Sequence, residues 1–305
     1  MQTTSGILTL AMCLIIQAAS YGQDYASPAG DDESPSFLQL NEALISSGGL
    51  LEYIPAAGQR EFAKLAPGSS ILARDISRFS QFPGVYVGGN AVSLQAGFSI
   101  RRADGSGYHP GRTLRLGFHY FSQQRYGYSS FNTVTTPWDT LTSSQTGDQF
   151  LVDSAFTETY TFQHWVDHLR LDAALVFRTV RESRWSWFGG VGMTFGPSLL
   201  SESFVERVTS RSTRIRDYGS GYDLGNTETD AESERENYTL NTVLGGSLYI
   251  PAGVDFRIGK QREFWKPIHL FYEVRPQILY TRIPELGNSV RTGIQQAIGL
   301  RVRWK

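Results

Sequence analysis

The chain has 305 residues, a formal net charge of -1 and a charged fraction of 19%, so it lacks the basic surface that nucleic-acid phosphates require, and no nucleic-acid partner is expected. Aromatic residues make up 13% of it and glycines number 31, which is typical of β-rich proteins with sharp bends and aromatic rings at a membrane interface. The single cysteine, Cys13, lies in an N-terminal apolar run, so we expect no disulfide and no thiolate metal site in the mature chain.

The chain opens with a short apolar run over residues 6–19. Ser20 and Gly22 are small residues at the positions where signal peptidase cleaves, which predicts a signal peptide over residues 1–22. No lysine or arginine precedes the run, unlike most signal peptides. The residues before Cys13 partly match a lipoprotein cleavage site, so a lipid anchor is the alternative.

Residues 23–81 have no regular pattern. Residues 23–35 are acidic, and residues 37–66 mix weak helix signals, among them residues 37–44 and 60–65, with glycine and proline. We predict a partly helical or irregular segment, which either stays in the periplasm or enters the following domain as a plug. Nowhere after the signal peptide does the chain approach the roughly 20 apolar residues of a membrane helix.

From about residue 82, apolar and polar residues alternate, which predicts strands whose two faces meet different surroundings. Val92 and Leu94 alternate with Ser93 and Gln95, for example. Seven segments have this pattern: residues 91–102, 113–122, 168–180, 187–196, 247–258, 270–281 and 297–304.

The connections between these segments alternate in length, as they do in outer-membrane barrels with short periplasmic turns and long outer loops. Residues 103–112, 181–186 and 259–268 are short, residues 123–150 and 205–237 are long, and residues 284–292 are intermediate. A periplasmic N-terminus then requires one earlier strand. We place it at Phe82–Gly88, with a tight turn at Gly88–Asn90. The sequence therefore predicts an all-β fold, a closed antiparallel transmembrane β-barrel of eight strands over residues 82–305.

The polar face of the strands carries charges of both signs, and an eight-stranded lumen is only wide enough for side chains to fill it. We predict that arginine–carboxylate pairs fill this lumen, because an unpaired buried charge is costly. The predicted structural lumen charges are Arg101, Arg115, Arg170, Asp172, Arg178, Asp255, Arg257, Glu273, Arg275, Arg301 and Arg303.

The other face is aliphatic, with aromatic residues near the strand ends, as expected for a surface that meets lipid. These aromatic residues are Tyr120, Trp165, Trp185, Trp187, Trp265, Tyr280 and Trp304. The alternative is a soluble lipocalin-like barrel with the apolar face turned inward around a ligand.

Residues 114–120 (Leu-Arg-Leu-Gly-Phe-His-Tyr) and the C-terminal strand at residues 297–305 resemble the small outer-membrane β-barrels of the OmpA-like, OmpX-like and PorT-like superfamily. In that family the barrel-assembly machinery reads a near-terminal aromatic residue. Here it is Trp304, followed by a lysine where the family has a terminal phenylalanine. The resemblance covers residues 82–305. It implies a Gram-negative outer membrane, with outer-membrane lipid, lipopolysaccharide and the assembly machinery as partners.

Motifs for enzyme chemistry are missing from the sequence, and we predict no catalytic, cofactor or metal site. His119 faces the predicted lumen and is interpreted as structural. His164 and His168 lie near Asp167 and form a conceivable metal-binding pair, but no third ligand has a compelling spacing. Outer-membrane lipid enzymes use a Ser/His/acid group near the lipid face, and none of these histidines lies there beside a serine.

We therefore expect a non-enzymatic outer-membrane barrel with a packed, charged lumen and long extracellular loops. Its expected roles are envelope integrity, surface binding, or support of a secretion or uptake complex through an envelope protein partner. Three alternatives remain open: a narrow pore, a lipid-modifying enzyme and a soluble lipocalin-like carrier.

Overall fold

The computed structural model describes residues 37–54, 59–74, 80–81, 85–102, 107–179, 183–217, 223–259 and 263–304. The predicted signal peptide and the acidic residues 23–35 lie outside the described residues. In the part of the chain that is described, no helix is long and apolar enough to cross a membrane.

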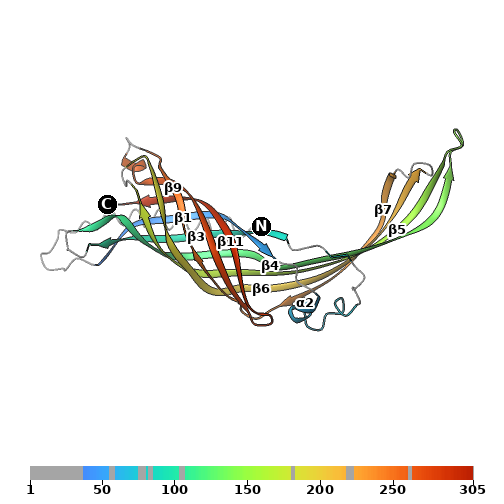
Figure 1. Ribbon diagram of the computed structural model, residues 1–305, viewed down its shortest axis with the longest axis horizontal. Helices are drawn as coiled ribbons and strands as arrows, with labels where there is room; N and C mark the ends of the chain where they lie inside the picture. The colour runs from blue at the N-terminus through green and yellow to red at the C-terminus, as the bar shows by residue number, and fades with distance from the viewer. Residues whose placement is uncertain are drawn as a thin grey trace.

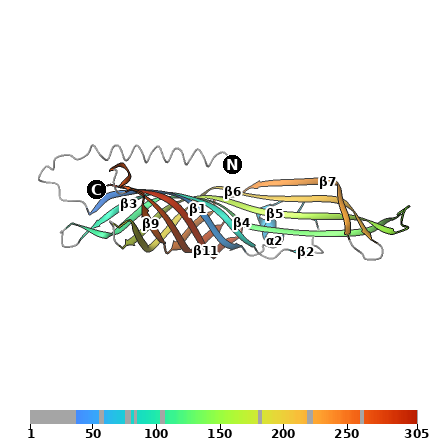
Figure 2. The same cartoon turned by 90° about the horizontal axis from the view of Figure 1, so that it is seen from above.

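One antiparallel sheet of 11 strands dominates the fold (Figures 1 and 2). The elements are β1 (Leu38–Ile54), α2 (Gln59–Leu65), β2 (Ser80–Gln81), β3 (Val85–Arg101), β4 (Tyr108–Thr142), β5 (Gln149–Arg178), β6 (Trp185–Asp217), β7 (Asp223–Thr239), β8 (Leu244–Tyr249), β9 (Ala252–Arg257), η1 (Glu263–Trp265), β10 (Ile268–Ile283) and β11 (Gly287–Arg303). Apart from end residues, the seven segments predicted from alternation coincide with strands where they are described, and the segment at residues 247–258 is divided between β8 and β9.

The hydrogen bonds of the sheet form a ring. Its order is β11-β1-β3-β4-β5-β6-β8-β10, and β10 pairs again with β11. The ring has an inner face, because side chains from strands that are not neighbours meet there: Arg178 of β5 contacts Glu42 of β1, and Arg115 of β4 contacts Glu273 of β10. Along β10, buried residues alternate with exposed ones, which distinguishes the inner from the outer face.

Prolines explain the break between β8 and β9, which both pair with β6 and β10. Pro251 lies in the gap, and Pro276 lies next to it in β10. A proline has no N–H to donate to a strand neighbour. The proline carbonyls still accept backbone hydrogen bonds: Gly190 N donates to Pro251 O at 3.0 Å, and Ile250 N donates to Pro276 O at 3.1 Å.

The predicted first strand was wrong. Val85–Arg101 is a single strand that runs through Gly88–Asn90 without a turn. The strand before it is β1, which pairs with both β11 and β3 and closes the ring. The sheet therefore starts at Leu38, not at residue 82, and the helix signal at residues 37–44 is also wrong. The alternation was hidden because the inner face of β1 mixes Leu44 and Leu50 with polar residues, and because a bulge follows Leu40.

The predicted long loops were also wrong. Residues 126–142 of β4, 149–164 of β5 and 203–217 of β6 continue as strands beyond the ring, and β7 pairs with β6 there. We call these parts with β7 the protruding sheet; Figure 1 shows it extending away from the ring. Cross-strand contacts such as Thr133 Oγ1 to Thr157 Oγ1 at 3.1 Å hold it together.

The predicted helix at residues 60–65 is confirmed as α2. The segment at residues 59–74 packs against the ends of ring strands and the base of the protruding sheet. Phe62, Leu65 and Ile71 are its fully buried anchors. They pack in one cluster with Tyr128, Tyr160, Phe162, Val166, Val205, Val243 and Ile283. This described part of the predicted periplasmic or plug segment therefore lies where β1 ends and β3 begins.

Candidate functional site

A cluster of ionic contacts occupies the inner face near the short turns. The carboxylate of Glu42 accepts hydrogen bonds from Arg178 Nη1 and Arg301 Nη1, both at 2.9 Å. Asp255 lies 3.1 Å from Arg301 Nη2, and His269 Nδ1 lies 2.9 Å from the same nitrogen. These side chains come from β1, β5, β9, β10 and β11, so the contacts join opposite sides of the ring.

A second cluster lies further along the ring and is equally buried. The carboxylate of Glu273 forms an ion pair with Arg115 Nη1 at 2.8 Å and a second one with Arg275 Nε. Arg275 Nη1 lies 3.1 Å from Asp172 Oδ2, which also accepts a bond from Gln95 at 2.7 Å. Each carboxylate is shared by several donors, the arrangement that offsets the cost of burying charge.

Most predicted lumen charges are buried on the inner face. Those are Arg115, Arg170, Asp172, Arg178, Asp255, Glu273, Arg275 and Arg301. Arg101, Arg257 and Arg303 are half-buried, close to the ends of their strands. Sequence reasoning missed Glu42 and also Glu52, which contacts Arg291 at 3.4 Å, because β1 was not recognised as a strand.

Aromatic rings separate and support the guanidinium groups. Arg115 Cζ lies 5.0 Å from the centre of the Phe188 ring, and Arg170 Cζ lies 4.8 Å from that of Phe121. Such stacking stabilises a cation where water is excluded. Charged and aromatic side chains together fill this part of the interior.

Glycines make room for the rings against the wall. A Cβ on Gly299 would lie 2.3 Å from Ile45 O and 2.6 Å from Phe271 Cζ. A Cβ on Gly253 would meet the Phe188 ring at 2.5 Å. The glycine-rich alternation in the sequence therefore reflects large inward side chains on neighbouring strands.

His119 lies in the interior, as the sequence indicated. Its Nδ1 is 3.7 Å from Asp172 Oδ2, and its Nε2 is 3.1 Å from Gln295 Nε2. The imidazole also stacks on Phe121 with ring centres 4.0 Å apart. These contacts fix the position of the imidazole in the interior.

The structure does not bring the other histidine group together. His164 and His168 are fully buried, and His164 Nε2 lies 3.1 Å from Ser201 Oγ. Asp167 is half-buried and accepts a hydrogen bond from Tyr120 at 2.8 Å instead. No group of three or more potential metal ligands occurs among the described residues.

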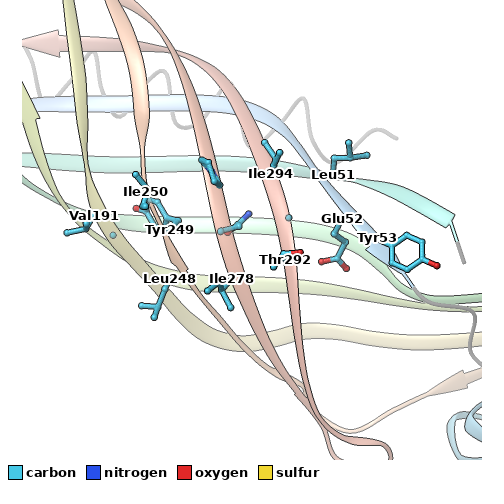
Figure 3. A pocket seen from close by; sticks show the side chains of 14 residues that line it. Leu51, Glu52, Tyr53, Val191, Leu248, Tyr249, Ile250, Ile278, Thr292 and Ile294 are labelled. Carbon is cyan, nitrogen blue, oxygen red and sulfur yellow. The ribbon is translucent and has the colours of Figure 1, made fainter.

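The outer face of the ring is apolar, and it carries a groove of about 800 Å³ beside the break between β8 and β9. Mostly apolar side chains line the groove, together with Glu52, Gln277 and Thr292. Figure 3 shows Leu248, Ile250, Ile278, Ile294 and Leu51 around it. The hydrophobic residues exposed here come from five strands, so this is a continuous apolar surface rather than scattered single residues.

Exposed aromatic side chains lie near both ends of that apolar face. At the short-turn end these are Trp185, Trp187, Phe264 and Trp265, and towards the protruding sheet they are Trp165 and Tyr280. Rings with an apolar body and a polar atom favour a membrane–water boundary.

Polar contacts also attach residues 59–74 to the protruding sheet. Glu236 accepts a hydrogen bond from Ser70 Oγ at 2.7 Å and another from Ser69, and Arg74 Nη2 lies 3.0 Å from Glu234. Burial raises the pKa of Glu236, but hydrogen bonds from Ser69, Ser70 and Tyr238 outweigh it and lower that pKa to about 2. Glu236 is therefore an ionised acceptor at neutral pH.

No family model matches the sequence, and no curated protein matches it. Several solved structures match the chain at low identity and low TM-score. Neisserial surface protein A shares 12% identity over 89% of this chain and 100% of its own, with a TM-score of 0.28. Ail of Yersinia pestis, in complex with the heparin analogue sucrose octasulfate, shares 11% identity over 87% and 100%, with a TM-score of 0.24.

Proposed function

We propose that this chain is an eight-stranded β-barrel protein of the Gram-negative outer membrane, with a sealed lumen and a protruding sheet that binds partners outside the cell. The observation that carries this is the closed ring of hydrogen bonds with shared charges inside and an apolar surface outside. A closed ring leaves no unpaired edge in lipid, where each unpaired group is costly.

The ring has eight strands if β8 and β9 are taken as one strand interrupted at Pro251, because both pair with β6 on one side and β10 on the other. The height of the apolar face supports a membrane span. It reaches from Leu169 to Phe177 on β5 and from Leu270 to Tyr280 on β10. These lengths fit the roughly 9–11 residues of a tilted transmembrane strand.

The same features weigh against the alternatives. A soluble lipocalin-like barrel would place this apolar face inside, whereas here it is exposed. A pore needs a water-filled lumen, whereas the interior holds shared ion pairs and aromatic rings. The His164–Ser201 pair is buried on the inner face, away from lipid, which supports a non-enzymatic role.

Binding outside the cell is assigned to the protruding sheet because it offers exposed apolar side chains. Val134, Trp138 and Leu141 of β4 are exposed there, Trp138 at 70%. Lipopolysaccharide, outer-membrane lipid and the assembly machinery remain the expected partners in the envelope, and an envelope protein partner would contact the same sheet.

Single cysteines test this topology, because Cys13 is the only cysteine of the chain and lies in the predicted signal peptide. Ser144→Cys lies at the β4–β5 turn and Ser183→Cys at the β5–β6 turn, at opposite ends of β5. A membrane-impermeant maleimide should label the Ser144→Cys variant on intact cells. It should label the Ser183→Cys variant only after the outer membrane is disrupted. Equal labelling of both variants on intact cells would refute the proposal.

A further inference from the structure

Charge is distributed unevenly between the two ends of the molecule. The described residues at the short-turn end, 101–102, 107–112, 178–179, 183–185, 257–259, 263–268 and 301–304, contain 9 Lys and Arg and 1 Glu. Arg178 and Arg301 among them are paired with Glu42 inside the ring. Residues 131–150 and 200–240, which include most of the protruding sheet, contain 5 Lys and Arg and 11 Asp and Glu. The short-turn end is therefore cationic in a chain whose net charge is -1.

Two arginines of this end lie on the outer surface beside aromatic rings. Arg112 of β4 lies opposite Phe177 of β5 in the sheet, and Arg112 Cζ is 6.0 Å from the centre of the Phe177 ring. Arg184 Cζ is 4.8 Å from the centre of the Phe256 ring, which also contacts Trp185 at 4.6 Å. Both arginines are exposed. Neither forms an ion pair within the part of the chain that is described.

Both arginines lie at the border of the apolar outer face. Phe177 is 46% exposed and Trp187 is 68% exposed. The two residues lie close together, because Thr179 N donates to Trp187 O at 3.0 Å. In a membrane, such an aromatic border lies at the depth of the lipid headgroups. A guanidinium beside a ring can still present its N–H edge to phosphate oxygens.

We propose that Arg112 and Arg184 bind the phosphate groups of anionic phospholipids in the inner, periplasmic leaflet. This rests on the proposed function, since it needs the ring to span the membrane with its short turns inside. The aromatic rings align the guanidinium groups, and the surrounding cations add long-range attraction. Binding here would also fix the depth and tilt of the barrel.

The test is the lipid retained by the full-length mature protein. Protein folded into vesicles of equal phosphatidylglycerol and phosphatidylcholine is extracted in mild detergent, and native mass spectrometry counts the lipids that remain bound. Wild type should retain phosphatidylglycerol in preference to phosphatidylcholine. Arg112→Gln and Arg184→Gln should each reduce that preference about five-fold, because a cation near an anionic surface contributes about 1 kcal/mol.

Arg235→Gln is the matched control, since Arg235 also lies over a ring, 4.1 Å from the centre of Phe204, but on the protruding sheet. It should leave the preference unchanged, whereas an equal loss would overturn the assignment. A second arm adds inorganic phosphate at constant ionic strength. Phosphate that displaces the lipid would show a site for free phosphate rather than for a headgroup. If the wild-type protein folds into vesicles but retains both lipids equally, this inference alone is refuted. If the wild-type protein does not fold into vesicles at all, the proposed function is refuted as well.

Discussion

Replacement of Glu42 by alanine should lower the free energy of unfolding by about 3–5 kcal/mol, the effect expected when one partner of a buried ionic cluster is removed. Glu42 is fully buried and has Arg178 and Arg301 at 2.9 Å and Arg115 at 3.8 Å. Without this carboxylate, three guanidinium groups face one another where little water can screen them.

Urea unfolding of protein folded in vesicles, followed by tryptophan fluorescence, would measure the change. Glu232→Ala is the control, because Glu232 is exposed on β7, and it should change stability by less than about 0.5 kcal/mol. A loss below about 1 kcal/mol for Glu42→Ala would contradict a shared, desolvated carboxylate.

Replacement of Phe62 by alanine should release the segment at residues 59–74 without unfolding the ring. Phe62 is fully buried, and its ring centre lies 5.4 Å from that of Phe162. Truncating a buried phenylalanine costs about 3–5 kcal/mol. The cost should appear locally, because this segment joins the sheet through side chains and not through the hydrogen bonds of the ring.

Amide hydrogen exchange at Ala66 and Leu72 would report the release. The Ala66 amide donates to Phe62 O at 2.8 Å, and the Leu72 amide donates to Ser69 Oγ at 3.1 Å. Both amides should exchange about 100-fold faster or more, since each ~1.4 kcal/mol is tenfold in population. Lys64→Ala, an exposed change on the same helix, should leave exchange unaltered. Faster exchange throughout β10 and β11 would instead show that the segment stabilises the whole ring.

The ring could be predicted from sequence where one face is apolar and the other is polar. On β10, Leu270, Tyr272 and Ile278 point outward, while Glu273 and Arg275 point inward, so the period of two is plain. β1 has no such contrast, because Leu44 and Leu50 lie on the same inner face as Glu42. The requirement for an earlier strand followed from the topology, but its position could not be predicted from periodicity.

The protruding sheet was missed for a different reason. Residues 132–142 are largely exposed on both faces, so no environment imposes alternation on them. The remaining signal was local: Thr133, Val134, Thr135 and Thr136 are β-branched and favour strands. Such a run between two alternating segments is better interpreted as a continued strand than as a loop.

The buried charged residues could likewise be predicted only in part. Arg115, Asp172 and Arg275 could be selected because they lie on the polar face of clear strands. Glu42, the carboxylate shared by Arg115, Arg178 and Arg301, and the position of the segment at residues 59–74 could not, since both depend on where β1 lies. Packing across the ring joins residues far apart in sequence, and no short-range pattern encodes those pairs.

Electrophoretic mobility before and after boiling is the most direct test of the closed, membrane-spanning ring. Protein recovered from the outer-membrane fraction should migrate at one position unboiled and at another after boiling, because a closed barrel resists unfolding by detergent alone. Identical mobility in both states, together with recovery in the soluble periplasmic fraction, would contradict the account.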